Sequence, residues 1–248
     1  MGYKKMRIVI LASGEGTTAR TLLNAVNNGI INCEVVGIIT NRQHLLHNFD
    51  IDSDNIRLEY VPPDIQEFDK SLLNAVNDIG GQIDLVCLLG WNKIVNSTFI
   101  RAFNNIINLH PALPGEYVGR GETCIQRALS DGKSRTGSMI HRVTSTLDRG
   151  EVLGQIEVPI LPTDNFETLR DRIKENEKGL VLSIVQQFIS KFNTSICGEI
   201  ESDKVYIGKV RRVEDIDYGL LLLSASDRLS AFDQHRCDVP MKGACLNN

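Results

Sequence analysis

The stretch RIVILASGEGTTARTLLNAV, residues 7–26, decides the fold. Its unbroken apolar run at residues 7–12 is typical of a central strand in a parallel sheet. Apolar side chains at helical spacing follow over residues 19–26, and the sequence NNG then predicts the end of a helix. A second apolar run, EVVGIIT at residues 34–40, completes a β-α-β unit, which requires a right-handed crossover and parallel strands.

The same alternation of strands and helices continues to about residue 195. Strands are predicted at residues 84–90, 104–110, 135–143 and 151–160, and helices at residues 68–80, 122–132 and 165–192. We therefore expect residues 1–195 to form one α/β domain with a doubly wound, mostly parallel, Rossmann-like sheet. A polar linker is expected at residues 196–203, followed by a short C-terminal β appendage at residues 204–248.

Composition narrows the class of protein. The 248 residues are 42% hydrophobic and 23% charged, which is ordinary for a globular protein. A net charge of −4 without a dominant basic patch argues against binding to nucleic acid. The six cysteines form no C-x-x-C pair, so zinc spacing is absent and a cytoplasmic, reducing location is predicted. The first apolar run is too short to cross a membrane, and no membrane association is expected.

A glycine motif lies between the first strand and the first helix. Gly14, Gly16 and Ala19 satisfy G-x-G-x-x-G/A, which is typical of a dinucleotide site. The second strand is followed by Arg42 rather than by a carboxylate that would hold a ribose, and an arginine there suits a 2′-phosphate. An NADP-dependent oxidoreductase is therefore one functional alternative.

The same loop is also suited to bind a single phosphate. Backbone N–H groups, the hydroxyls of Ser13, Thr17 and Thr18, and the N-terminus of the helix all converge there. A tight strand-to-helix turn without a ligand is the structural alternative, because a glycine motif by itself is a weak signal.

The segment IINLHPALPG, residues 106–115, ends a strand with two polar side chains that point the same way, Asn108 and His110. In open α/β sheets ligands bind beyond the carboxyl ends of the strands, so this pair and the Ser13 loop are expected to face one crevice. Pro111 keeps the backbone of His110 extended. An amide donor for an oxyanion beside an imidazole base predicts acyl transfer.

A histidine is a stronger base when a nearby carboxylate raises its pKa, and Asp148 in the loop TSTLDRG is the candidate. A carboxylate close to His110 would raise the pKa of the imidazole. The alternative is that Asp148 only caps a turn with Gly150. His141 competes for the role of base, but its place inside a strand predicts a packed, structural side chain.

Glu177 lies on the apolar stripe of the long predicted helix, three residues before Leu180 and four after Ile173. A buried carboxylate without a partner is costly. We expect that a ligand hydroxyl pairs with Glu177 or that its side chain reaches the rim of the cleft.

Five segments together resemble the phosphoribosylglycinamide formyltransferase family, which serves purine biosynthesis: ASGEGTTARTLLNAV, LLGWNKIV, INLHPALPGEYVG, TGSMIHRV and LDRGEV. The resemblance covers about residues 6–192. Asn-x-His-Pro with a later Asp-x-Gly is typical of folate formyltransferases in general. The glycine loop favours the member that acts on glycinamide ribonucleotide over amino-sugar or methionyl-tRNA formyltransferases.

The resemblance implies formyl transfer from 10-formyltetrahydrofolate to the amine of glycinamide ribonucleotide, without a metal. In that family pattern Asn108 stabilises the oxyanion, His110 is the general acid and base, and Asp148 raises the pKa of His110. The non-enzymatic alternative is a binding or scaffold remnant, which would bind folate without forming product.

The resemblance also implies which residues bind the two substrates. The phosphate would be held by the loop and the ribose by Glu177, while the folate would contact the segment at residues 92–95 and Asn108. The implied substrate-binding residues are Ser13, Gly14, Gly16, Thr17, Thr18 and Glu177, and the implied folate-binding residues are Asn92, Lys93, Ile94, Val95 and Asn108. Asn92 and Lys93 replace the family's usual Met and Arg, and Ile65 falls where an Arg is common.

The tail at residues 204–248 resembles a different family. Its GKVR strand is similar to the opening of phosphoribosylaminoimidazole-succinocarboxamide synthase, and Lys209 matches the lysine of that ATP-binding lobe. About 40 residues are too few to form that enzyme's core. The tail is therefore expected to be the truncated start of that lobe, which makes a fused or neighbouring purine-pathway enzyme a candidate partner. An unrelated β-hairpin is the alternative.

Overall fold

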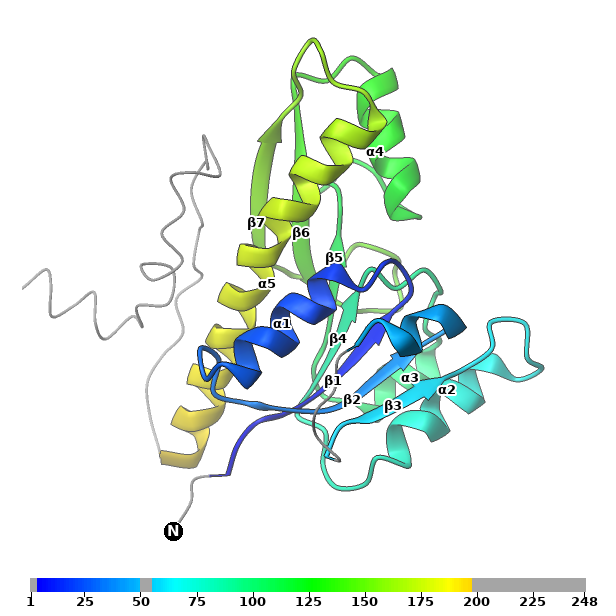
Figure 1. Cartoon of the computed structure of the whole chain (residues 1–248), viewed down its shortest axis with the longest axis vertical. Helices are drawn as coiled ribbons and strands as arrows, with labels where there is room; N and C mark the ends of the chain where they lie inside the picture. Colours follow the sequence, from blue (N-terminus) through cyan, green and yellow to red (C-terminus); the bar gives the residue numbers. More distant parts are fainter. Residues whose placement is uncertain (1–3, 50–54, 198–248) are drawn as a thin grey trace, which may run out of the picture.

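The computed structural model describes residues 4–49 and 55–197 (Figure 1). The predicted β appendage at residues 204–248 and most of the predicted linker lie outside the described residues. Among the residues described, no helix has the length and apolar character needed to cross a membrane.

A single seven-stranded sheet runs through the described chain in the order β3-β2-β1-β4-β5-β6-β7. Neighbours among the first five strands of that order are parallel, whereas β5–β6 and β6–β7 are antiparallel. The strands are β1 (Arg7–Ala12), β2 (Glu34–Thr40), β3 (Arg57–Tyr60), β4 (Leu85–Leu89), β5 (Ile106–His110), β6 (Arg135–Arg142) and β7 (Val152–Pro159). The predicted mostly parallel, Rossmann-like α/β sheet is confirmed.

Helices cover both faces of this sheet (Figure 1). They are α1 (Thr17–Asn27), α2 (Phe68–Asn77), α3 (Ser97–Ala102), α4 (Gly121–Ser130) and α5 (Phe166–Cys197), with a short 3-10 turn η1 (Gln43–His47). One core packs α1 and α5 on one face, and a second core packs α2 and α3 on the other. Ile10 of β1 joins the first core and Leu11 joins the second, which explains why this central strand is apolar without a break.

The predicted bounds of β1 and β2 agree with the structure, and the remaining predicted strands and helices lie where they were expected. The sequence did not predict β3, η1 or α3. The edge strand β3 carries Arg57 and Glu59 and no apolar run, and α3 has only six residues, too few to show a helical period. The last helix reaches Cys197 rather than residue 192, and so runs two residues past the predicted domain boundary at 195.

The strand order places the functional loops together. The crossover after β1 leads to β2 on one side, while β4 pairs with β1 on the other side. Such a switch point opens a crevice beyond the carboxyl ends of the central strands. The glycine loop follows β1, the segment at residues 90–95 follows β4, and Asn108 and His110 end β5, so all three border this crevice.

Candidate active site

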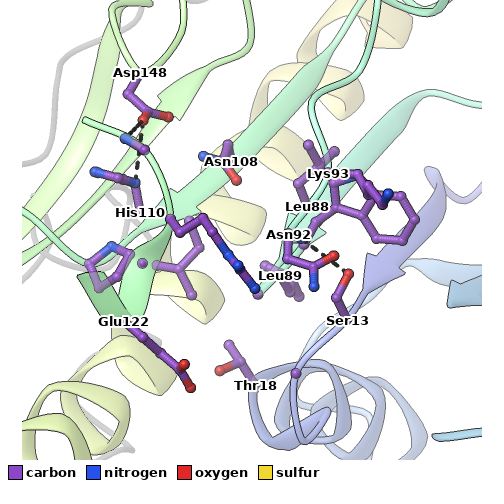
Figure 2. A pocket seen from close by; sticks show the side chains of 18 of the residues that line it. Ser13, Thr18, Leu88, Leu89, Asn92, Lys93, Asn108, His110, Glu122 and Asp148 are labelled. Atoms are coloured by element: carbon purple, nitrogen blue, oxygen red, sulfur yellow. Dashed lines mark hydrogen bonds and ion pairs between the residues drawn. The ribbon is translucent and has the colours of Figure 1, made fainter. Parts of the chain in front are cut away.

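A cleft of about 620 Å³ opens at this edge of the sheet, a size typical of small-molecule sites. Figure 2 shows Asp148 and His110 on one side, Ser13, Asn92 and Lys93 on the other, and Asn108 between them. The cleft brings together the residues predicted to be catalytic or to bind the two substrates: Ser13, Gly14, Gly16, Thr17, Thr18, Asn92, Lys93, Ile94, Val95, Asn108, His110, Asp148 and Glu177. Within the described part of the chain, no group of three or more His, Cys, Asp or Glu side chains is arranged to hold a metal ion.

His110 is almost fully buried at the end of β5, and its two ring nitrogens have different neighbours. Nε2 lies 2.8 Å from the backbone oxygen of Tyr117. Because a carbonyl only accepts hydrogen bonds, Nε2 must carry a hydrogen. Nδ1 lies 3.7 Å from Oδ2 of Asp148. In the neutral ring Nδ1 therefore holds the lone pair, and it is the nitrogen that can take a proton.

The sequence predicted that Asp148 would raise the pKa of His110, and Asp148 does act in that direction, although the net pKa is lowered. Burial of the ring lowers the pKa of His110. The charge of Asp148 and the bond to Tyr117 act in the predicted upward direction, but burial outweighs them, with a small further lowering from His141. His110 is therefore a neutral base at pH 7, and Asp148 stabilises the imidazolium when a proton arrives.

Asp148 is held in a strained conformation, with φ at 51° in the left-handed region. Its Oδ2 accepts a hydrogen bond of 2.9 Å from the backbone N–H of Gly119. Burial opposes ionisation, but His141, this N–H group and His110 together hold the pKa of Asp148 below its usual value. The carboxylate is thus ionised and acts only as an acceptor, a more specific role than capping a turn.

His141 was expected to be a packed side chain, and it is buried as expected. It lines the cleft, with Nε2 at 3.1 Å from Nδ2 of Asn108 and 3.5 Å from Oδ1 of Asp148. The cause is the antiparallel pairing of β5 with β6, which sets Asn108 directly opposite His141. The sequence shows a histidine in β6, but it does not show how β6 is aligned with β5, so it could not predict that His141 lies opposite Asn108.

Cys124 is a second neighbour of His110 that the sequence did not single out. Its Sγ lies 3.8 Å from Nε2 of His110. Burial, followed by the nearby charge of Asp148, raises the pKa of the thiol to about 11. Cys124 is therefore a neutral thiol and not an activated nucleophile.

The glycine loop has the backbone of an anion site. Gly16 precedes α1 with φ at 71°, a backbone conformation that favours glycine. A Cβ at this position would also lie only 3.1 Å from Cζ of Phe49, so a larger residue is disfavoured by both conformation and contact. The first turn of α1 contains no acidic residue that would compete for its N–H groups. Thr18 is buried and faces the cleft with Thr17. These features favour a bound phosphate over a turn without a ligand.

The segment after β4 is tied to the glycine loop. The backbone N–H of Asn92 donates a 3.1 Å hydrogen bond to Oγ of Ser13, and Asn41 donates one of 2.8 Å to Oδ1 of Asn92. The side chain of Asn92 is therefore anchored to Asn41, which directly follows β2. The glycine loop and the segment after β4 consequently form one hydrogen-bonded unit.

Within the same segment the side chains have different environments. Lys93 donates to the backbone oxygen of Pro63 at 3.1 Å and lies 5.5 Å from the ring centroid of Phe68. Ile94 is 71% exposed, whereas Val95 is buried in the core beneath. Ile94 thus presents an apolar side chain to the cleft. The side chain of Lys93 instead contacts Pro63 and Phe68.

Glu177 is buried, and it has a hydrogen-bond partner on β6. Oγ of Ser138 donates a 2.7 Å hydrogen bond to Oε1 of Glu177. Burial raises the pKa of Glu177, opposed by this bond and by the charge of Lys174. The side chain nevertheless lines the cleft, so its second oxygen is placed to meet a ligand hydroxyl.

Comparisons with known proteins agree with this geometry. The formyl transferase family profile matches residues 6–185. A phosphoribosylglycinamide formyltransferase of Dictyostelium discoideum is 34% identical over 199 residues, covering 71% of this chain and 95% of that protein. The crystal structure of glycinamide ribonucleotide transformylase 1 from Symbiobacterium toebii gives a TM-score of 0.66 at 28% identity, covering 75% of this chain and 89% of that one.

A longer relative contains a similar region. The trifunctional purine biosynthetic protein adenosine-3 of Bos taurus is 25% identical over 186 residues, which cover 74% of this chain and 18% of that protein. The family profile spans well over half of the chain, and the Dictyostelium relative is matched over nearly its whole length. The chain belongs to the formyl transferase family.

Proposed function

We propose that this protein transfers a formyl group from 10-formyltetrahydrofolate to the amine of glycinamide ribonucleotide in de novo purine biosynthesis. The observation that carries the proposal is one cleft in which Asn108, His110 and Asp148 lie beside a phosphate-type glycine loop. The relatives named for this activity support the same acceptor. The NADP-dependent alternative leaves the three polar residues without a role, although Arg42 does line the cleft.

In the proposed mechanism the amine attacks the formyl carbon and forms a tetrahedral intermediate. The amide of Asn108 stabilises the oxyanion, and Nδ1 of His110 takes a proton from the attacking amine. Asp148, 3.7 Å from that nitrogen, stabilises the resulting imidazolium. His110 then returns the proton to the departing folate nitrogen as the carbon–nitrogen bond breaks. No step calls for a metal ion.

The two substrates would occupy different ends of the cleft. The glycine loop suits the phosphate of the ribonucleotide, and Glu177 suits a ribose hydroxyl. The exposed side chain of Ile94 and the backbone of residues 92–95 suit the folate. The hydrogen bond from Asn92 to Ser13 would then couple the two binding regions.

The test is release of tetrahydrofolate with glycinamide ribonucleotide as acceptor. We expect turnover with this acceptor and none with an amino-sugar nucleotide or methionyl-tRNA, which are the substrates of the alternative formyltransferases. Folate binding without product would favour the remnant alternative. Tight NADPH binding without folate binding would overturn the proposal.

We also propose the domain division. Residues 1–195 would be the formyltransferase domain, and residues 204–248 would begin a second purine-pathway domain, as their GKVR segment suggests. The trifunctional relative supports fusion as an arrangement for this family. Sequencing the transcript beyond the codon for Asn248 tests this division, and an immediate stop codon would contradict a fused second enzyme.

Replacing Glu177 with glutamine is expected to raise KM for glycinamide ribonucleotide by about ten- to a hundredfold, with a smaller change in kcat. The reason is the loss of a charge-assisted hydrogen bond to the ribose, worth roughly 1.5–3 kcal/mol. Steady-state kinetics with each substrate varied in turn measures the effect. Glu175→Gln on the same helix, outside the cleft, is the matched control. A change confined to KM for the folate would contradict the assignment.

Replacing Asp148 with asparagine is expected to move the acid limb of the kcat/KM profile to lower pH and to reduce the plateau by roughly tenfold or more. Asp148 favours the protonated form of His110, so its removal lowers the pKa of the imidazole further. Initial rates over a pH series provide the measurement. Asp78→Asn, at an exposed site outside the cleft, should leave the profile unchanged. A shift of the limb to higher pH would refute this electrostatic role.

A further inference from the structure

The contact between Asn108 and His141 is the feature of the cleft that the mechanism has not yet used. These residues face each other across β5 and β6, and His141 is 2% exposed. Nδ2 of Asn108 and Nε2 of His141 are 3.1 Å apart. The direction of this hydrogen bond decides how the amide of Asn108 is oriented, because an asparagine has donors at one end and an acceptor at the other.

The backbone fixes the tautomer of His141. Its Nδ1 lies 2.9 Å from the carbonyl oxygen of Arg142, which can only accept, so Nδ1 carries a hydrogen. In the neutral ring Nε2 then has no hydrogen, so it accepts a hydrogen bond from a neighbouring donor. Asn108 is the neighbour able to supply it, since the ionised carboxylate of Asp148, 3.5 Å away, has no hydrogen to give.

Among the described groups, Asn108 lies nearest to this nitrogen, at 3.1 Å against 3.5 Å for Oδ1 of Asp148. The ring of His110 meets that of His141 edge to face with centroids 6.4 Å apart, too far for a hydrogen bond between them. The charged or titratable groups around Nε2 are therefore Asp148 and His110, and the amide of Asn108 is the donor.

We propose that His141 is a positioning residue for formyl transfer, which holds the amide nitrogen of Asn108 in place so that its second N–H group faces the reacting centre. The inference rests on the proposed function. An amide nitrogen carries two hydrogens, and the one bonded to His141 prevents the amide from turning over. A turned amide would present an oxygen to the developing oxyanion, which is repulsive rather than stabilising.

The test compares His141→Met, which removes the acceptor, with His141→Gln, whose amide oxygen can still accept from Asn108. We expect His141→Met to lower kcat about tenfold and to leave the KM values little changed. The loss should be smaller than that caused by removing the oxyanion donor itself, because Asn108 is still present. His141→Gln should recover most of this loss. His47→Gln, at an exposed site outside the cleft, is the control.

A double-mutant cycle separates positioning from a general structural role. In an Asn108→Ala background, His141→Met should cost much less in kcat than in the wild type, with only its effect on Asp148 remaining. An equal loss in both backgrounds, or no recovery with glutamine, would overturn the inference. A wild-type protein without formyl transfer would instead overturn the proposed function.

If His141→Met does not fold, NMR of the labelled wild-type protein decides the question. We expect one Nδ2 proton of Asn108 to be shifted downfield and slow to exchange, because it is bonded to an imidazole nitrogen. Two Nδ2 protons at ordinary side-chain amide shifts, both in rapid exchange with water, would overturn the inference.

Discussion

Replacing His110 with alanine is expected to lower kcat for formyl transfer by about 10²- to 10⁴-fold, with KM values for both substrates little changed. His110 lines the cleft, and its Nδ1 lies 3.7 Å from the carboxylate of Asp148. Its neighbours are not placed to replace it, because Cys124 is a neutral thiol with a pKa of about 11 and Nε2 of His141 lies 3.1 Å from the amide of Asn108. Steady-state and single-turnover kinetics measure the loss.

Two controls distinguish a loss of catalysis in His110→Ala from a loss of folding. His110 is buried, so the thermal unfolding of the variant must be compared with that of the wild type. His47→Ala, which removes an exposed imidazole outside the cleft, should keep full activity. The acid limb of the pH profile should disappear with His110, since burial places the pKa of that base below 6.5. Near-normal turnover in His110→Ala would exclude the proposed base.

The sequence predicted the parts of the fold that depend on local pattern. The run at residues 7–12 is buried on both faces, so apolar continuity alone located β1 and the glycine loop after it. The ends of parallel strands meet at one edge of the sheet, so the sequence alone predicts that Asn108 and the Ser13 loop share one cleft. Glu177 was noticeable because it interrupts an apolar stripe.

The features that were not predicted depend on pairing and burial rather than on local pattern. His141 reaches the cleft because of the register of β5 with β6, which no short motif encodes. The pKa of His110 is lowered because burial outweighs a correctly predicted neighbour, and the extent of burial is a property of the whole fold. Ser138 became the partner of Glu177 because β6 packs against α5.

The contact between Tyr117 and His110 could not be predicted from the sequence either. Its side chain attracted no functional prediction, and its contribution to the cleft is a backbone oxygen that fixes the tautomer of His110. The turn after Pro111 and Pro114 brings that oxygen to Nε2, and every residue type carries such an oxygen. Sequence patterns identify side chains, so a catalytic contact made by the main chain leaves no signal in them.

Replacing Asn108 with alanine is expected to lower kcat by about 10²- to 10³-fold while leaving KM for both substrates close to the wild-type values. The amide is needed when the oxyanion develops, so its loss affects the transition state more than substrate binding. Chemical-quench single-turnover kinetics isolates that step. Asn108→Asp, which keeps the shape but brings a negative charge to the oxyanion, should be at least as slow as alanine. Conversely, a tenfold rise in KM with unchanged kcat would show that Asn108 binds a substrate rather than stabilises the oxyanion.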